Sequence, residues 1–268
     1  MQRQGTGEQR YKALKKKSIY QMIYGIIFWI FLFYIWLGYI WLGLPHINVL
    51  FWIIYLSLLA YLIFCGIQLS IRINNLFLED IDLDAYRYFV GICKPGKKAE
   101  TIYFTTFRKC RIELAEGRFK DALSILETTI SNHSLEKVTT FRQLTIFRQL
   151  ILCSIYLADE EKYQYWLSSL QGVATNRKSL LKLKDSLLEE MQAIHDLVIN
   201  KQPNPFFETH TAKNRFSYLF NLYYKGINAK LNRDEEKVLT CFEELAKENE
   251  QLFIVQQAKE ELRKAMMA

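Results

Sequence analysis

The chain has 268 residues, a formal net charge of +7 and 50% hydrophobic residues, a length that allows one large or two modest domains. Much of the positive excess stands in residues 1–18, where six basic residues accompany one acid, Glu8, whereas bases and acids nearly balance in residues 73–268. A nucleic-acid-binding protein normally carries its excess charge on the folded domain, so this distribution argues against nucleic acid as a partner.

Two membrane-spanning helices are predicted after the basic tail. Residues 18–71 contain no Asp, Glu, Lys or Arg. We expect transmembrane helices over residues 19–44 and 49–73, because about 20 helical residues cross a bilayer core. A short external turn over residues 45–48 contains Pro45, which disfavours helix. A cleaved signal peptide is the alternative, but the apolar run is too long and no A-x-A-like site ends it.

The charges that flank the spans predict their orientation. The tail, residues 1–18, is basic, further basic residues follow the second span, and the turn over residues 45–48 contains no Lys or Arg. The positive-inside rule therefore places both termini in the cytoplasm. Basic residues close to a bilayer attract anionic headgroups, at about 1 kcal/mol each. The candidates for this contact are Lys15, Lys16, Lys17, Arg72, Lys94, Lys97 and Lys98.

A juxtamembrane joint over residues 74–98 follows, and its last part resembles a phosphate-binding loop. The stretch G91-I-C-K-P-G-K-K98 fits the pattern G-x-x-x-x-G-K-[ST] except at Lys98, where a magnesium-binding hydroxyl should stand. The preceding segment does not have a clear strand pattern, and Pro95-Gly96 is a turn dipeptide. We interpret the stretch as a basic turn between helices.

The joint also contains acids at alternate positions. Asp80, Asp82 and Asp84 have the rhythm of calcium ligands, but a loop that begins at Asp80 has Ala85 where an EF-hand needs Gly. Acids at the start of a helix interact favourably with its positive end. We therefore interpret these acids as the beginning of a short helix over residues 83–93.

Residues 99–268 show helical periodicity and few Gly or Pro residues. The expected helices cover residues 100–116, 119–130, 138–158, 162–173, 179–200, 213–231, 235–248 and 252–266. Short joints make neighbouring helices antiparallel, and Asp234 is placed to cap the helix that follows it. The predicted fold is all-α: a two-helix transmembrane hairpin followed by a cytoplasmic α-solenoid or helical bundle.

Two parts of this region resemble tetratricopeptide repeats. The segment G117-R-F-K-D-A122-L-S-I-L-E-T-T-I130 is similar to the second half of such a repeat, with a chain-breaking Gly117 and a small Ala122. Gly226 and Phe242 have the separation of the small and large residues that pair in one repeat. The resemblance implies a tetratricopeptide-like solenoid. The whole plan resembles uncharacterised membrane proteins of low-GC Gram-positive bacteria, which implies a bacterial cell membrane.

No pattern in the chain predicts chemistry. The four histidines are scattered, and the five cysteines lie far apart, as a reducing compartment tolerates. No G-x-S-x-G motif appears. We therefore expect no catalysis, no cofactor and no metal site. An enzyme whose site has no short motif is the alternative that stays open.

The predicted function is a membrane-anchored scaffold or adaptor that binds another protein. The resemblance implies a concave face lined by the first helices of the repeats. Arginine suits carboxylates of a partner and tyrosine offers flat contact area. The candidate partner-binding residues are Arg108, Arg111, Arg142, Arg148, Tyr218, Tyr223 and Tyr224. The alternative is an accessory subunit of a membrane transporter or enzyme that docks through its aromatic transmembrane hairpin.

Overall fold

The computed structural model describes residues 6–41, 47–94 and 96–267, and within these ranges every regular element is a helix. The expected all-α class is therefore confirmed for the described chain. The chain divides into two compact units, residues 1–89 and residues 90–268.

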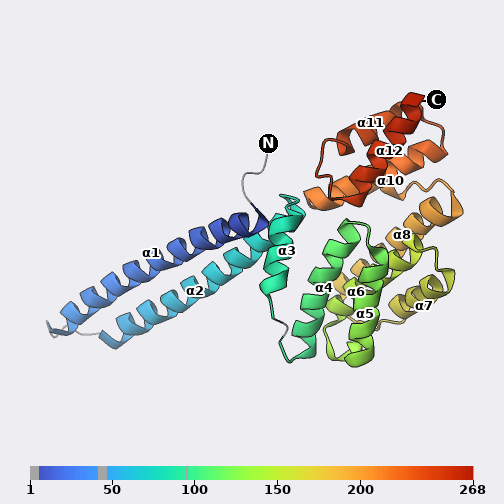
Figure 1. Cartoon of the computed structure of the whole chain (residues 1–268). Coiled ribbons are helices and arrows are strands. Elements are labelled where there is room, and N and C mark those ends of the chain that lie inside the picture. Colours follow the sequence, from blue (N-terminus) through green and yellow to red (C-terminus); the bar gives the residue numbers. More distant parts are fainter. Residues whose placement is uncertain (1–5, 42–46, 95, 268) are drawn as a thin grey trace. The chain divides into compact units, whose positions relative to one another are not determined.

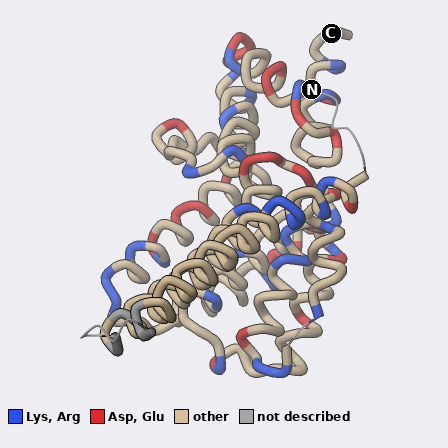
Figure 2. Tube along the Cα trace, turned by 90° about the vertical axis from the view of Figure 1, so that its left-hand side faces the viewer, with Lys and Arg blue, Asp and Glu red and all other residues tan. Residues whose placement is uncertain are grey.

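The first unit is built on two long helices that lie side by side, α1 (Gly7–Trp41) and α2 (Ile47–Leu78) (Figure 1). Both contain apolar stretches long enough to cross a membrane, and the described part of the chain does not bury these stretches. In Figure 2 the two long helices are almost entirely free of charged residues along this part. The expected pair of membrane-spanning helices is confirmed in length and composition.

Helix α1 begins within the predicted basic tail, residues 1–18. It starts at Gly7 and continues without a break into the apolar stretch of the predicted first span. Lys12 supports this first part because its ammonium group lies 2.5 Å from Glu8, one turn earlier. Of the expected external turn, residues 45 and 46 lie outside the described residues, and α2 begins at Ile47.

A small core ties the first part of α1 to the end of α2 and to α3 (Leu83–Ile92). The rings of Phe77 and Tyr86 are fully buried with their centroids 5.0 Å apart. Tyr11 of α1 is buried beside Phe89, at 5.7 Å. Close contact of α1 with α3 also requires Gly7, because a Cβ there would collide with the backbone at residues 84 and 85.

A buried ion pair lies in this core. Arg10 donates from Nε to Asp82 Oδ2 over 2.6 Å and from Nη2 to Asp82 Oδ1 over 2.7 Å, a bidentate arrangement. The hydrogen bond with Asp82 raises the pKa of Arg10. Asp82 also accepts the amide of Ala85 over 3.1 Å and so caps α3. The acid expected to begin this helix does so, and it also holds α1 in place.

The second unit consists mainly of antiparallel helical hairpins (Figure 1). Their helices are α4 (Ala99–Ala115) with α5 (Phe119–Asn132), α6 (Thr140–Tyr156) with α7 (Glu160–Gln171), and α10 (Arg215–Leu231) with α11 (Glu235–Leu245). A short 3₁₀ turn, Leu135–Lys137, joins the first two hairpins. Since α6 packs against α4, α5, α7 and α8, consecutive hairpins are stacked.

Elements that do not form a hairpin separate the second hairpin from the third. Helix α8 (Lys178–His195) packs on α6 and continues into a π-helical turn, Asp196–Asn200. The short α9 (Phe206–Thr209) then leads to α10, and α12 (Phe253–Met267) packs against α11 and α10. The stack of hairpins is therefore interrupted at α8, where the expected helix over 179–200 ends in a wider turn.

All three hairpins turn with the same backbone geometry. The second residue after the first helix has positive φ in each case: Gly117 (78°), Ala158 (53°) and Arg233 (60°). The next amide donates to a carbonyl five residues earlier over 2.8–3.0 Å, as in a Schellman motif. Asp159 and Asp234 then cap the second helices. The turns therefore repeat even where the sequence of the helices does not.

Aromatic rings join the first two hairpins to α12. Phe119 of α5 stacks on Tyr156 of α6 with ring centroids 4.3 Å apart and planes 3° from parallel. Phe253 of α12 meets both rings edge-on, at 5.1 and 5.2 Å. Gly117 allows this approach, because a Cβ there would lie 2.8 Å from the Cβ of Phe253.

Gly226 makes room for a ring in the third hairpin. A Cβ at this position of α10 would lie 2.5 Å from Cε1 of Phe242 on α11, so the predicted pair of small and large residues is in contact. The substitution Gly226→Ala should overpack this contact and destabilise the second unit by about 1–3 kcal/mol. Thermal unfolding of the detergent-solubilised chain, followed by circular dichroism, measures the effect.

Gly91→Ala is the matched control for this prediction. A Cβ at Gly91 meets no atom within 4 Å, and alanine is the better helix former, so we expect an unchanged or slightly higher melting temperature. Equal melting temperatures for the two variants would contradict the packing argument.

Removal of the Asp82 carboxylate should release the first part of α1. In Asp82→Ala the Arg10 charge loses its bidentate partner and α3 loses its cap, losses of about 3–5 and about 1 kcal/mol for fully buried groups. The Arg10 side chain is 20% exposed, so we expect the lower part of this range. Hydrogen exchange should accelerate in residues 7–17 and leave α4–α7 unchanged. Asp84→Asn, which alters a more exposed carboxylate 3.7 Å from Arg10, should have the smaller effect.

Candidate functional site

Three of the predicted arginines are brought together by α4 and α6. The guanidinium carbon of Arg108 lies 3.9 Å from the ring centroid of Phe104. That of Arg142 lies 4.8 Å from Phe104 and 5.3 Å from Phe107. That of Arg111 lies 5.5 Å from Phe107. These five residues are called the arginine–phenylalanine cluster below.

Helical spacing on α4 generates most of this cluster. Phe104 and Phe107 each precede an arginine by four residues, so rings and guanidinium groups share one face of the helix. Arg142 comes from the first turn of α6, which packs on α4. Each cation over a ring contributes about 0.5–2 kcal/mol, depending on desolvation. The rings therefore hold three positive charges in fixed places.

Burial and mutual repulsion raise the energy of these charges. Arg108 is 8% exposed, and the side chain of Arg142 is 12% exposed. Burial lowers the pKa of Arg142, and the positive charge of Arg108 lowers this pKa further. The carboxylate of Glu100, at 3.6 Å, acts in the opposite direction. Arginine nevertheless stays protonated in proteins. A carboxylate brought to the cluster would offset the repulsion between its cations.

Exposed aromatic surface adjoins the charges. Phe104 is 36% exposed and Phe141, next to Arg142 in the chain, is 50% exposed. Aromatic and arginine side chains together are enriched at the centres of protein interfaces. The combination suits a ligand with both carboxylates and apolar groups, such as a peptide segment.

Arg148 has a structural role instead. Its Nε donates to Glu190 Oε2 over 2.9 Å and its Nη2 to Glu190 Oε1 over 2.5 Å, so the pair connects α6 to α8. Burial lowers the pKa of Arg148, but the Glu190 carboxylate outweighs burial and the net shift is upward. The structure does not place this arginine in the cluster.

The predicted tyrosines all lie on α10, in different environments. Tyr218 is 44% exposed, and its hydroxyl donates to Glu244 over 2.7 Å, which raises the pKa of Tyr218. Tyr223 and Tyr224 are buried, and the hydroxyl of Tyr224 lies 2.8 Å from that of Tyr156. Of the three, only Tyr218 has a ring at the surface.

The basic residues expected near headgroups fall into both units. In the first unit, Lys16 lies over the ring of Tyr20, with Nζ 5.6 Å from the centroid, and Arg72 of α2 donates to Ser18 and Gln21 of α1 over 3.1 and 3.0 Å. Lys15 and Lys17 are exposed on α1. Lys94, Lys97 and Lys98 are exposed in the second unit.

The loop that resembles a phosphate-binding motif lies between α3 and α4. A helix precedes it, where a phosphate-binding loop follows a strand. Pro95 lies outside the described residues. The described part of this stretch therefore agrees with a connection between helices.

Sequence reasoning missed the two rings and the acid that accompany the arginines. The pattern F104-T-T-F-R-K-C-R111 was visible, and its spacing could have indicated rings and cations on one face. Glu100, which lies 3.6 Å from Arg142 and accepts the amide of Thr139, could not be assigned from spacing, because its partners belong to another helix.

Comparison with known proteins leaves the class to be defined by the structure itself. No family model matches the chain, and no curated protein or solved structure matches it. Over its described residues the protein is all-helical, with two helices long and apolar enough to cross a membrane and a second unit of helical hairpins.

The pair Arg148–Glu190 should contribute to stability and leave binding unaffected. In a double-mutant cycle of Arg148→Met and Glu190→Gln we expect a coupling of about 1–2 kcal/mol, because the hydrogen bonds are charged and bidentate. Urea unfolding followed by circular dichroism measures this coupling. Additive effects of the two substitutions would contradict the assigned role.

Proposed function

We propose that the chain is a membrane-anchored adaptor. The hairpin of α1 and α2 crosses the membrane, both termini are cytoplasmic, and the second unit binds a partner protein without catalysing a reaction. Two apolar helices without charged residues over 18–71 support the anchor. The basic residues beside the hairpin and the lack of any in the connecting turn support the orientation.

The second unit is proposed to be an irregular tetratricopeptide-like solenoid. The shared turn geometry at Gly117, Ala158 and Arg233 supports a common origin of its three hairpins in one structural unit. The contact of Gly226 with Phe242 supports the resemblance in the third hairpin. Stacked hairpins of this kind bind extended segments along a surface lined by their first helices, and α4 and α6 are such helices.

The arginine–phenylalanine cluster is the observation that carries the binding proposal. It joins three fixed guanidinium groups with adjacent exposed aromatic surface on the first helices of two hairpins. Guanidinium forks bind carboxylates with two hydrogen bonds. The proposed partner is therefore a protein with an acidic segment, and membrane anchoring raises its effective concentration if that protein is also at the membrane.

Site-specific photocrosslinking in cells tests this proposal. A photoreactive residue in place of Phe141, which is half exposed beside the cluster, should give a discrete adduct with a partner. Arg111→Glu or Arg142→Glu should reduce the adduct about tenfold or more, because each reversal removes a charged hydrogen-bond donor of about 1.5–3 kcal/mol and adds repulsion.

The controls separate binding from folding and from charge. Arg263→Glu makes the same charge reversal at an exposed position on α12 and should leave the adduct unchanged. Circular dichroism should be equal for Arg111→Glu and Arg263→Glu. Arg142→Glu places a carboxylate beside Glu100 in a mostly buried position, so its adduct is compared only if its spectrum is also unchanged. An adduct that persists in the cluster variants, or that forms equally well from the exposed Leu239 of α11, would contradict the proposed surface.

Exchange of the spans separates the adaptor from an accessory subunit that docks within the membrane. The aromatic side chains that α1 and α2 expose, among them Tyr24 and Trp52, offer a contact surface to another membrane protein and so support this second function. An adaptor should keep its adduct when residues 19–71 are replaced by an unrelated hairpin. Loss of the adduct with the arginines intact would favour docking through the spans.

A further inference from the structure

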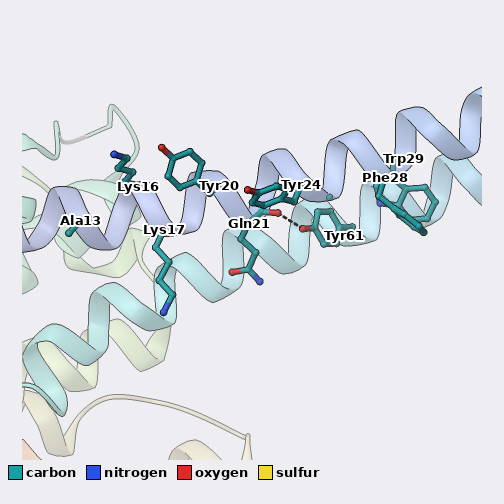
Figure 3. Close-up of a pocket in the computed structure, with 10 residues that line it drawn as sticks. Ala13, Lys16, Lys17, Tyr20, Gln21, Tyr24, Phe28, Trp29 and Tyr61 are labelled. Atoms are coloured by element: carbon teal, nitrogen blue, oxygen red, sulfur yellow. Dashed lines mark hydrogen bonds between the residues drawn. The ribbon is translucent and has the colours of Figure 1, made fainter.

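A groove runs along one face of α1 at the N-terminal end of its apolar stretch. Lys16, Tyr20, Tyr24 and Phe28 follow one another at intervals of four residues and form one ridge of the helix. A second ridge, displaced by one residue, contains Lys17 and is continued by residues four and eight positions later. The space that these residues line has a volume of about 980 Å³ (Figure 3).

The second ridge is low because it contains a glycine. Gly25 lies between Gln21 and Trp29 in this ridge, and Tyr61 of α2 lies against it so closely that a Cβ would collide with the ring. The hydroxyl of Tyr61 donates to the carbonyl of Gln21 over 2.7 Å, which fixes the ring there (Figure 3). The floor of the groove is therefore built by both helices of the hairpin.

One end of the groove is cationic. Lys16 and Lys17 line it, and Lys16 is held over the ring of Tyr20 at 5.6 Å. Arg72 adds a third cation nearby, since it donates to Gln21, which lines the groove. No Asp or Glu stands in the chain between Glu8 and Glu79. The sequence thus places cations at this end of the hairpin, and residues 9–78 contain no acid that could neutralise them.

The other end is apolar, and none of the described residues covers it. Tyr24 is 72% exposed and Phe28 is 56% exposed. Figure 3 shows the lysines at one end of the row and Phe28 with Trp29 at the other. From Lys17 to Phe28 the helix rises about 16 Å at 1.5 Å per residue, about half the thickness of a bilayer core.

We propose that this groove binds one anionic phospholipid. Its phosphate lies between Lys16 and Lys17, and one acyl chain lies along Tyr24, Phe28 and Trp29. The change from cationic to apolar along the groove matches a phospholipid from headgroup to chain, whereas free phosphate would occupy the cationic end alone. A zwitterionic lipid would bring its own cation toward the lysines. The inference rests on insertion of the hairpin in a membrane and is independent of the partner of the second unit.

A specific lipid site should depend on the residues that line the groove, whereas general attraction to headgroups should depend equally on similar residues outside it. Lys15 carries the same charge on the same turn of α1 and is exposed, but it does not line the groove. Phe31 is an equally exposed phenylalanine of α1, at 61%, that also does not line it. The chain therefore supplies a matched control for each end of the proposed site.

Native mass spectrometry of the full chain in detergent micelles, titrated with phosphatidylglycerol, tests the proposal. We expect one lipid to bind before any others. Lys16→Gln and Lys17→Gln should each weaken this binding about fivefold and together about 25-fold, from the strength of a lysine near an anionic surface. Phe28→Ala should weaken it severalfold. Lys15→Gln and Phe31→Ala should change it less than twofold.

Each alternative result has a defined meaning. Equal losses for Lys15→Gln and Lys16→Gln, or equal binding of phosphatidylcholine, would overturn selective recognition of an anionic headgroup. Equal effects of Phe28→Ala and Phe31→Ala, or displacement of the lipid by inorganic phosphate, would overturn the role of the apolar end. A chain that stays soluble without detergent would overturn membrane insertion and this site together, whereas loss of the photocrosslinked partner would leave the lipid result untouched.

Discussion

The apolar side chains that α1 and α2 turn outward are the constraint on which the rest of the structure depends. Tyr24, Phe31 and Trp52 are each more than half exposed, and apolar surface costs about 25 cal/mol per Å² in water. Helices that satisfy their own backbone hydrogen bonds can keep such surface in lipid at no comparable cost. Under the proposed insertion of the hairpin in a membrane, the second unit would be kept at the membrane surface.

Local sequence patterns predicted much of the fold, but they could not predict which distant residues pair. The uncharged stretch over residues 18–71 predicted two long helices, and short polar joints predicted the hairpins. The sequence also predicted that Asp82 begins a helix, but its pairing with Arg10 crosses 72 positions of the chain. No periodicity reports a contact at that distance, so the continuation of α1 back to Gly7, which this pair holds in place, was missed.

The candidate site was also predictable only in part, because local spacing is visible in the sequence and long-range pairing is not. Helical spacing within α4 places Arg108 and Arg111 on one face, and the choice of first helices grouped them with Arg142, which lies over the same two rings. Arg148 looked equivalent, but Glu190, 42 residues away, engages it in the connection to α8. Tyr224 looked like surface because tyrosine tolerates water, whereas its ring and hydroxyl both have partners in the core.

The same physical device occurs in both units: a cation held beside an aromatic ring. In the first unit Lys16 lies over Tyr20, and in the second Arg108 and Arg142 lie over Phe104. A cation that is already ordered loses less conformational entropy when an anion binds. Both proposed sites therefore present cations that aromatic rings have ordered before an anion arrives, and each would bind its anion at a lower entropic cost than freely rotating side chains would.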